Sequence, residues 1–291
     1  MKPAPFEYVA ASSANDAVRL LGEHGDEALI LAGGQSLVPM MNMRLARPTV
    51  LIDINDCGDL KFMATAGDGD GFGIGAGTRQ KDILKSAATR AAVPLLLKAL
   101  AFVGHVQTRN RGTLGGSIAH GDPSAEIPLV AVTLDAGIRL RNSGVEREIA
   151  ASRFYSGPMS TEREPDECLM AVKFPVWPGA TGTGFHEVSE RHGDFAVVAA
   201  AAQIGLDEDG TCVAAAIGIG GAHPFPRKAA KAEAVLIGQV PTEDIIAEAA
   251  EAAADGIEAM DDVHATGAYR MRVARVLAAR AISDAAREAR P

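Results

Sequence analysis

A glycine pair that separates a strand-like run from a helix-like run constrains the fold of this chain more than any other local feature. The apolar residues 28–32 end at Gly33-Gly34, and a segment rich in leucine, valine and methionine follows. Apolar residues at helical spacing predict a helix before the strand, which Ser12 or Ser13 can cap and His24-Gly25 can close. TVLIDI predicts a second strand over 49–54. The order helix, strand, turn, helix, strand predicts a small α/β unit.

The middle of the chain, from about residue 60, predicts a second unit of helices and strands. A glycine-rich stretch contains a short strand around Ile74. Apolar residues alternate with arginines over 138–141 before Asn142-Ser143-Gly144, which is typical of a β-hairpin. The other expected elements are helices over 78–88, 92–102 and 125–134, a loop over 109–111 and a strand over 168–175.

The segment PVWPGATGTG, residues 175–184, is the best candidate for a domain boundary, because two prolines and three glycines interrupt it. We therefore expect a first domain over 1–177, with lobes of about 1–58 and 59–177, and a second domain over 178–291. Beyond the boundary the sequence predicts strands over 185–190, 195–206 and 212–218, followed by helices over 227–236, 242–254 and 268–287.

Composition excludes several functional classes. The 291 residues carry a net charge of -9 and no cluster of Lys, Arg and aromatic residues, so we expect no nucleic-acid partner. No apolar run approaches the roughly 20 residues of a membrane-spanning helix. Pro and Glu interrupt the start, MKPAPFEYVAASS, where a signal peptide would have its apolar core. We expect no membrane span and a cytoplasmic location.

Metal binding by this chain alone is not expected. Cys57, Cys168 and Cys212 lie far apart and match neither zinc spacing nor iron–sulfur spacing. The odd number of cysteines also argues against a disulfide framework. The seven histidines form no H-E-x-x-H motif. We therefore assign no metal ligand.

Two similar phrases suggest a binding site for phosphate: AGGQSL over 32–37 and LGGSIAHGDP over 114–123. A glycine pair exposes backbone N–H groups and leaves room for a phosphate, and Ser36 can add a hydroxyl at a helix start. Two such loops could grip a pyrophosphate from both sides without Lys or Arg. Each pair taken alone is better explained as an ordinary turn.

Other common motifs do not fit. Neither loop is G-x-G-x-x-G at the first strand–helix unit or G-x-x-x-x-G-K-[ST]. GFGIGAGT lacks an acidic residue at the right distance, so we interpret it as structural. GGQSL is not the G-x-S-x-G nucleophile elbow. We therefore assign no catalytic residue.

Taken together, the two phrases resemble one protein family. AGGQSLVPMMNMRLARPTVLIDI and RGTLGGSIAHGDPSAEIPLV, about eighty residues apart, are similar to the FAD-binding medium subunit of the molybdenum hydroxylases, the family of xanthine dehydrogenase and aerobic carbon monoxide dehydrogenase. The resemblance continues through FHEVSERHGDFAVVAAAAQI and covers essentially the whole chain. It implies an α+β fold: a two-lobed FAD-binding domain of the vanillyl-alcohol-oxidase (PCMH) type, followed by a smaller α+β C-terminal domain.

The resemblance also implies which residues bind FAD. Ser117 stands where many relatives have Asn, and Glu126 stands where the family usually has an Asp that binds the ribose part of FAD. Met170 falls in a strand that packs near the flavin in relatives. The predicted cofactor-binding residues are Ala32, Gly33, Gly34, Gln35, Ser36, Leu37, Thr113, Leu114, Gly115, Gly116, Ser117, His120, Asp122, Glu126, Met170, His186 and Phe195.

Two of these residues have competing explanations. Phe195 occupies the position of an aromatic, often Tyr, that can stack on the flavin, although a buried core Phe explains it equally well. In some relatives a Lys at or near residues 185–187 contacts flavin; this chain has no Lys there and His186 is the candidate substitute, although a surface His is the simpler explanation. His105, near the second loop, is best explained as a structural His.

The resemblance implies an oxidoreductase subunit that transfers electrons. In this family a substrate is hydroxylated at a molybdenum cofactor on a large subunit, and electrons pass through two [2Fe–2S] clusters on a small subunit to FAD. The flavin then delivers them to an external acceptor. We therefore expect FAD in this chain, and the molybdenum cofactor and [2Fe–2S] clusters on partner subunits. The implied assembly is a dimer of heterotrimers.

Two alternatives remain open at this point. A self-contained FAD-dependent oxidoreductase acting on a small molecule would need a base near flavin N5, and the sequence offers no convincing candidate. A flavin-free scaffold subunit would tolerate side chains in both turns. A bulky substitution at Gly33 or Gly116 is expected to abolish flavin retention if the loops hold pyrophosphate, and to leave it unchanged if they are ordinary turns.

Overall fold

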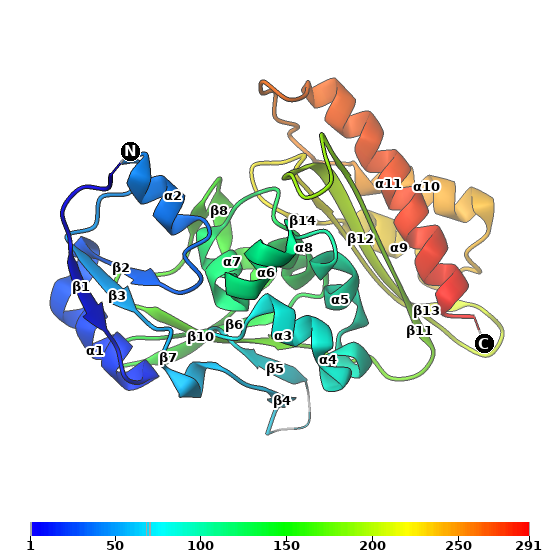
Figure 1. Cartoon of the computed structure of the whole chain (residues 1–291). Helices are drawn as coiled ribbons and strands as arrows, with labels where there is room; N and C mark the ends of the chain where they lie inside the picture. Colours follow the sequence, from blue (N-terminus) through cyan, green and yellow to red (C-terminus); the bar gives the residue numbers. More distant parts are fainter. Residues whose placement is uncertain (1, 68, 70, 291) are drawn as a thin grey trace.

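The three larger β-sheets of the described residues, each covered by helices, divide the molecule into three parts (Figure 1). The computed structural model describes residues 2–67, 69 and 71–290. A three-stranded sheet forms the first lobe, a five-stranded sheet the second lobe, and a four-stranded sheet the C-terminal part. The expected α+β fold, with two N-terminal lobes and a C-terminal unit, is therefore confirmed.

The first lobe is the small α/β unit that the sequence predicts. Its sheet is parallel in the order β1-β3-β2. Ser13 caps the first helix by accepting a hydrogen bond from the amide of Asp16 at 3.1 Å. The first strand is not predicted by the sequence. The elements are β1 (Glu7–Ala10), α1 (Ala14–His24), β2 (Ala28–Leu31), α2 (Leu37–Asn42) and β3 (Val50–Asp53).

The second lobe has an antiparallel sheet in the order β4-β5-β10-β6-β7. The predicted hairpin is confirmed, with the Asn142 carboxamide oxygen accepting from two turn amides. The strands are β4 (Met63–Thr65), β5 (Phe72–Gly75), β6 (Gly137–Arg141), β7 (Glu146–Ala150) and β10 (Cys168–Phe174), with a separate ribbon of β8 (Tyr155–Gly157) and β9 (Ser160–Thr161).

The described part of the second lobe also contains six short α-helices, and two expectations about them are wrong. The helix expected over 78–88 is two helices, because Ser86 is extended and its hydroxyl caps the second one. The expected loop over 109–111 lies in a helix. The helices are α3 (Gln80–Lys85), α4 (Ala87–Ala92), α5 (Pro94–Leu100), α6 (Val106–Arg111), α7 (Leu114–His120) and α8 (Glu126–Thr133).

The C-terminal part is an antiparallel sheet, β11-β12-β13-β14, covered on one face by three helices. Arg227 and Lys228 form a strand, so the helix expected from residue 227 begins only at Ala230. The elements are β11 (Thr181–Ser189), β12 (Ala196–Leu206), β13 (Cys212–Gly220), β14 (Arg227–Lys228), α9 (Ala230–Leu236), α10 (Glu243–Ala253) and α11 (Gly267–Glu288).

The glycines that suggested a linker over 175–184 partly serve close packing. β11 already begins at Thr181, and α11 lies directly against it. A Cβ atom at Gly182 or Gly184 would collide with backbone carbonyls of α11. The absence of side chains therefore allows this helix to approach the strand, a reason that the sequence alone does not reveal.

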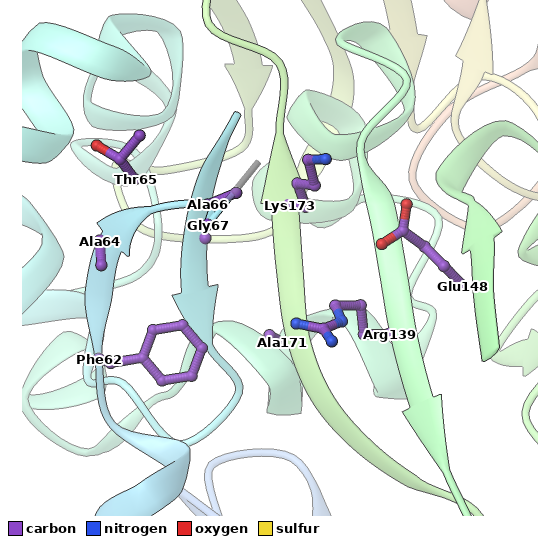
Figure 2. Close-up of a pocket in the computed structure, with 10 residues that line it drawn as sticks. Phe62, Ala64, Thr65, Ala66, Gly67, Arg139, Glu148, Ala171 and Lys173 are labelled. Carbon is purple, nitrogen blue, oxygen red and sulfur yellow. The ribbon is translucent and has the colours of Figure 1, made fainter. Parts of the chain in front are cut away.

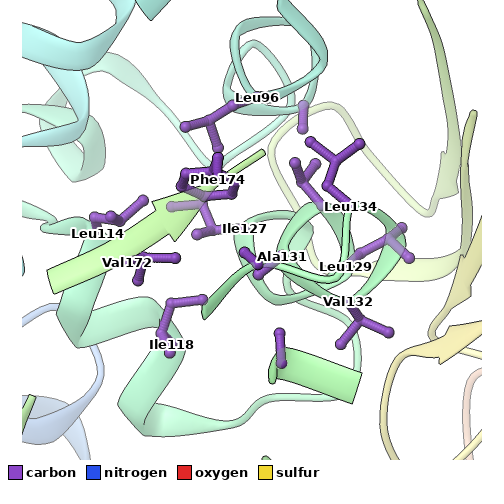
Figure 3. Packing of buried hydrophobic residues seen from close by; sticks show 14 of the residues in the cluster. Leu96, Leu114, Ile118, Ile127, Leu129, Ala131, Val132, Leu134, Val172 and Phe174 are labelled. Atoms are coloured by element: carbon purple, nitrogen blue, oxygen red, sulfur yellow. The ribbon is translucent and has the colours of Figure 1, made fainter. Parts of the chain in front are cut away.

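Helix α8 joins the second lobe to the C-terminal part. All eight of its residues are buried. Figure 3 shows its apolar side chains among residues of α5, α7 and β10, such as Leu96, Ile118 and Phe174. The same core cluster includes Phe185 and Ala199 of the C-terminal sheet. A helix that is buried on every side, and apolar apart from Glu126 and Thr133, is suited to this position between two sheets.

Candidate cofactor-binding site

A cavity of about 550 Å³ lies where the two lobes and the C-terminal part meet. Its volume is within the range of about 300–1,000 Å³ that is usual for small-molecule sites. The first lobe contributes the turn after β2 and the start of α2, and the second lobe contributes the segment around α7. The C-terminal part contributes Gly193, Asp194 and Phe195.

The two glycine loops touch each other in this cavity. A Cβ atom at Gly33 would lie 2.5 Å from the carbonyl oxygen of Arg111 and 2.9 Å from the Cα of Gly112. Gly33 is therefore required for the contact between the loops. Its neighbour Gly34 has φ +70°, a left-handed conformation that glycine adopts without strain.

The first loop presents unpaired backbone donors to the cavity. The amide N–H groups of residues 33–37 donate to no acceptor among the described residues, and all five residues line the cavity. The Ser36 hydroxyl makes no capping hydrogen bond to α2. Successive N–H groups that converge on one space attract an anion. This loop therefore has the chemistry of a phosphate site.

The second loop differs, because its own fold uses its amides. The amide of Gly115 donates to Ala76 O at 2.9 Å, and the amide of Gly116 donates to the hydroxyl of Thr113 at 3.0 Å. Ser117 N donates to Thr113 O at 3.3 Å. The expectation that both glycine pairs expose free donors is thus wrong for the second pair.

The second loop instead leaves space for close packing and for a ligand. A Cβ atom at Gly115 would lie 2.5 Å from that of Ala76, so Gly115 permits packing against the end of β5. A Cβ atom at Gly116 would meet only the Thr113 hydroxyl, at 2.8 Å, and Ala32 Cβ, at 3.8 Å. Gly116 therefore faces the open cavity opposite the first loop, and a ligand can approach the backbone closely there.

An acidic side chain lies in the wall beyond the second loop. Glu126 begins α8 and is only 7% exposed. Burial raises the pKa of Glu126 to about 8, with further increases from nearby Glu187 and Asp122 and an opposing effect from Arg109. The protonated carboxyl can donate as well as accept hydrogen bonds, which suits a partner with sugar hydroxyl groups.

Glu187 in β11 is a second buried carboxyl close to Glu126. Burial raises the pKa of Glu187 to about 7, and its Oε2 atom has no hydrogen-bond partner among the described residues. An ionised Glu187 adds to the effect of burial in raising the pKa of Glu126.

Phe195 is 68% exposed at the edge of the cavity, which rules out the explanation as a core residue. The backbone before it is held by His105, whose ring atoms would lie 2.5–3.0 Å from a Cβ atom at Gly193. Gly193 has φ +90°, which suits glycine alone. An exposed aromatic ring on a supported loop is thus available to stack on a planar ligand.

Most of the predicted residues lie around the cavity. Those that line it are Ala32, Gly33, Gly34, Gln35, Ser36, Leu37, Thr113, Gly115, Gly116, Ser117, His120, Asp122, Glu126 and Phe195.

Three predicted residues lie elsewhere. Leu114 is fully buried in the apolar core. Met170 packs against the core of the first lobe, while its neighbour Leu169 lines the cavity. A register shift in β10 occurs at this point. His186 points away, and its Nε2 lies 2.8 Å from the carboxylate of Asp284 in α11.

The structure also adds residues to the cavity that the sequence did not identify. Gln80, Met159, Arg163 and Glu167 belong to no motif. They come from α3 and from the segment before β10, and only the packing of these elements brings them to the loops. Gln80 had one weak signal, its position directly after the glycine-rich strand β5.

A second depression lies on the outer face of the five-stranded sheet (Figure 2). Phe62, Arg139, Glu148 and Lys173 surround it, and none of them belongs to a predicted site. Arg139 already pairs with Glu146 across the hairpin. This depression therefore gives no comparable case for a cofactor.

Among the described residues, no helix has the length and apolar character needed to cross a membrane. Within 2–67, 69 and 71–290, no three or more His, Cys, Asp or Glu side chains are grouped so as to hold a metal ion.

Comparison with known proteins covers both halves of the chain. Residues 4–177 match the family described as FAD binding domain in molybdopterin dehydrogenase. Residues 183–285 match the family described as CO dehydrogenase flavoprotein C-terminal domain. The chain is 38% identical to the 6-hydroxypseudooxynicotine dehydrogenase complex subunit alpha of Paenarthrobacter nicotinovorans, over 100% of this chain and 98% of that protein.

The similarity extends to a carbon monoxide dehydrogenase. The chain is 32% identical to the carbon monoxide dehydrogenase medium chain of Hydrogenophaga pseudoflava, over 98% of both proteins. A solved structure of carbon monoxide dehydrogenase from that organism, lacking the Mo-pyranopterin moiety of its molybdenum cofactor, matches with a TM-score of 0.94 and 34% identity. The match covers 98% of each chain, so sequence and fold agree over both lobes and the C-terminal part.

Proposed function

This chain belongs to the FAD-binding medium subunits of the molybdenum hydroxylase family, and from that membership we propose that it is the electron-transfer subunit of a heterotrimeric enzyme. In this proposal a small subunit carries [2Fe–2S] clusters and a large subunit carries the molybdenum cofactor. FAD, when bound, supplies the redox chemistry between the clusters and an external acceptor.

The row of free N–H groups over residues 33–37 is the observation that carries this proposal. Neutral donors of this kind suit the pyrophosphate of FAD, and Gly116 leaves the opposite wall open for it. Phe195 is placed to stack on the isoalloxazine ring, and Glu126 to bond a sugar hydroxyl. The residues present therefore fit FAD, and their role is to hold and orient it.

Two rival functions make different demands on the same cavity. A self-contained FAD-dependent oxidoreductase needs a proton-accepting side chain beside the flavin. A flavin-free scaffold gives no reason for five amides to face one cavity with only water as a partner. The amides therefore favour a bound anion over the scaffold.

The proposal also includes the assembly and the division of the chain. We propose a dimer of heterotrimers, a cytoplasmic location and a domain division after residue 177. The family matches over 4–177 and 183–285 support this division. Limited proteolysis that cuts between β10 and β11 would support it too, and cell fractionation tests the location.

Purification of the tagged chain from its native host tests the function. FAD, iron and molybdenum that co-purify with two further chains would support the relay. FAD without partners or metals would favour the self-contained flavoenzyme. Partners and metals without flavin would contradict the assignment of the cavity to FAD and favour the scaffold.

A further inference from the structure

Gln80 carries a buried polar group for which the described protein offers no partner. The side chain is 4% exposed, and its Oε1 atom accepts no hydrogen bond. No hydrogen bond from its side-chain amide nitrogen to a described residue is found either. Because buried polar groups in folded proteins are nearly always paired, an unpaired carboxamide in a cavity wall indicates a partner outside the chain.

Gln80 lies at the point where the two glycine loops meet. Its backbone amide donates to Gly112 O at 3.0 Å. A Cβ atom at Gly112 would lie 2.8–2.9 Å from the Gln80 carboxamide. Gly112 also packs against Gly33, where a Cβ atom would lie 2.9 Å from the Cα of Gly112. The carboxamide therefore lines the same cavity as the free amides of the first loop.

The cation at the start of this helix, Arg79 directly before α3, is already engaged. The guanidinium of Arg79 donates to the carboxamide oxygen of Asn55 and to the carbonyl oxygen of Arg111. Arg79 therefore binds other parts of the protein, and its guanidinium is not directed at a ligand in the cavity. Where the two loops meet, the groups that can hydrogen-bond a ligand are therefore neutral, namely the first-loop amides and Gln80.

We propose that Gln80 is a cofactor-binding residue whose carboxamide hydrogen-bonds the phosphate–sugar part of FAD. This inference rests on the proposed function. The Oε1 atom is closed to solvent, so the Nε2 group is the one that can donate to an oxygen of the phosphate or of the sugar.

The test is FAD binding by the purified chain, measured as quenching of flavin fluorescence, together with the thermal midpoint of the flavin-free protein. Gln80→Met keeps a similar volume and removes the hydrogen bonds. We expect it to weaken FAD binding about tenfold, which corresponds to about 1.4 kcal/mol. Gln80→Glu keeps the shape and adds a negative charge, so we expect a larger loss against a phosphate.

Gln203 supplies a matched control. It is 3% exposed in β12 and its Oε1 also lacks a partner, but it does not line the cavity. Gln203→Met should leave FAD affinity unchanged. Neither methionine variant should lower the thermal midpoint of the flavin-free chain, since each removes an unpaired polar atom.

The outcomes separate the two levels of inference. Wild-type affinity in Gln80→Met would overturn the assignment of Gln80 while leaving the proposed function intact. A fall in the thermal midpoint that matches the loss of affinity would make Gln80 a packing residue, and would overturn the assignment as well. If the wild-type chain takes up no FAD either alone or in the complex purified from its host, the proposed function fails, and the role of Gln80 fails with it.

Discussion

The glycines of the two loops should respond differently to the same added methyl group. In the flavin-free protein, Gly116→Ala places a Cβ 2.8 Å from the hydroxyl of Thr113 and otherwise in open space. The cost is at most the capping hydrogen bond of α7, about 1 kcal/mol. Replacing Gly by Ala inside a helix returns about 1 kcal/mol. The flavin-free fold should therefore keep nearly its full stability.

The same change at Gly115 or Gly33 meets rigid neighbours. At Gly115 the new atom lies 2.5 Å from Ala76 Cβ, and at Gly33 it lies 2.5 Å from a backbone oxygen of Arg111. Overpacking of this kind costs about 1–3 kcal/mol. Both variants should unfold at lower temperature even without flavin, so Gly33 cannot distinguish a phosphate loop from an ordinary turn, contrary to the expectation from sequence.

The assay pairs thermal unfolding of each flavin-free variant with its FAD dissociation constant. Gly116→Ala should bind FAD at least about tenfold more weakly, or about 1.4 kcal/mol, because the methyl group occupies the wall opposite the phosphate donors. Unchanged affinity in this variant would refute the claim that the cofactor approaches Gly116. A thermal midpoint as low as that of Gly115→Ala would refute the claim that Gly116 faces open space.

Three further predictions concern the cavity and the C-terminal part. The folded pKa of Glu126, about 8, exceeds the ordinary glutamate value of 4.5, so the folded state holds an extra proton and the unfolding free energy should fall as pH rises between these values. In Glu126→Gln, the unfolding free energy measured by chemical denaturation should fall less between about pH 5 and pH 8.5 than in the wild-type protein. An equal fall in the two proteins would contradict this prediction. Arg270 is buried and donates to two backbone carbonyls, so Arg270→Met should lower the unfolding free energy by about 2–4 kcal/mol in denaturant titration; a loss below about 1 kcal/mol would argue against this role. Phe195→Ala should weaken FAD binding about two- to tenfold with little effect on stability, while His186→Asn should leave the FAD affinity unchanged. A larger loss of FAD affinity in His186→Asn than in Phe195→Ala would contradict the placement of both side chains.

Local sequence patterns were sufficient for the parts of the fold that depend on near neighbours. The hairpin around Asn142-Ser143-Gly144 and the capped helix after Ser13 both appear as predicted. Each depends on contacts within a few residues, so its signal lies in one short segment. The strand at β1 was missed, because four mostly exposed residues gain their pairing only from the distant β3.

The sequence by itself determined the family, the positions of the two loops and most of the residues around the cavity, because each loop is a contiguous phrase. Only the tertiary structure decided what each residue does there. In the structure the first loop offers backbone hydrogen-bond donors, while the second loop leaves space for a ligand. The structure also places Gln80 where the two loops meet and directs His186 toward α11. These assignments depend on contacts between segments tens of residues apart and on burial, which no local pattern encodes.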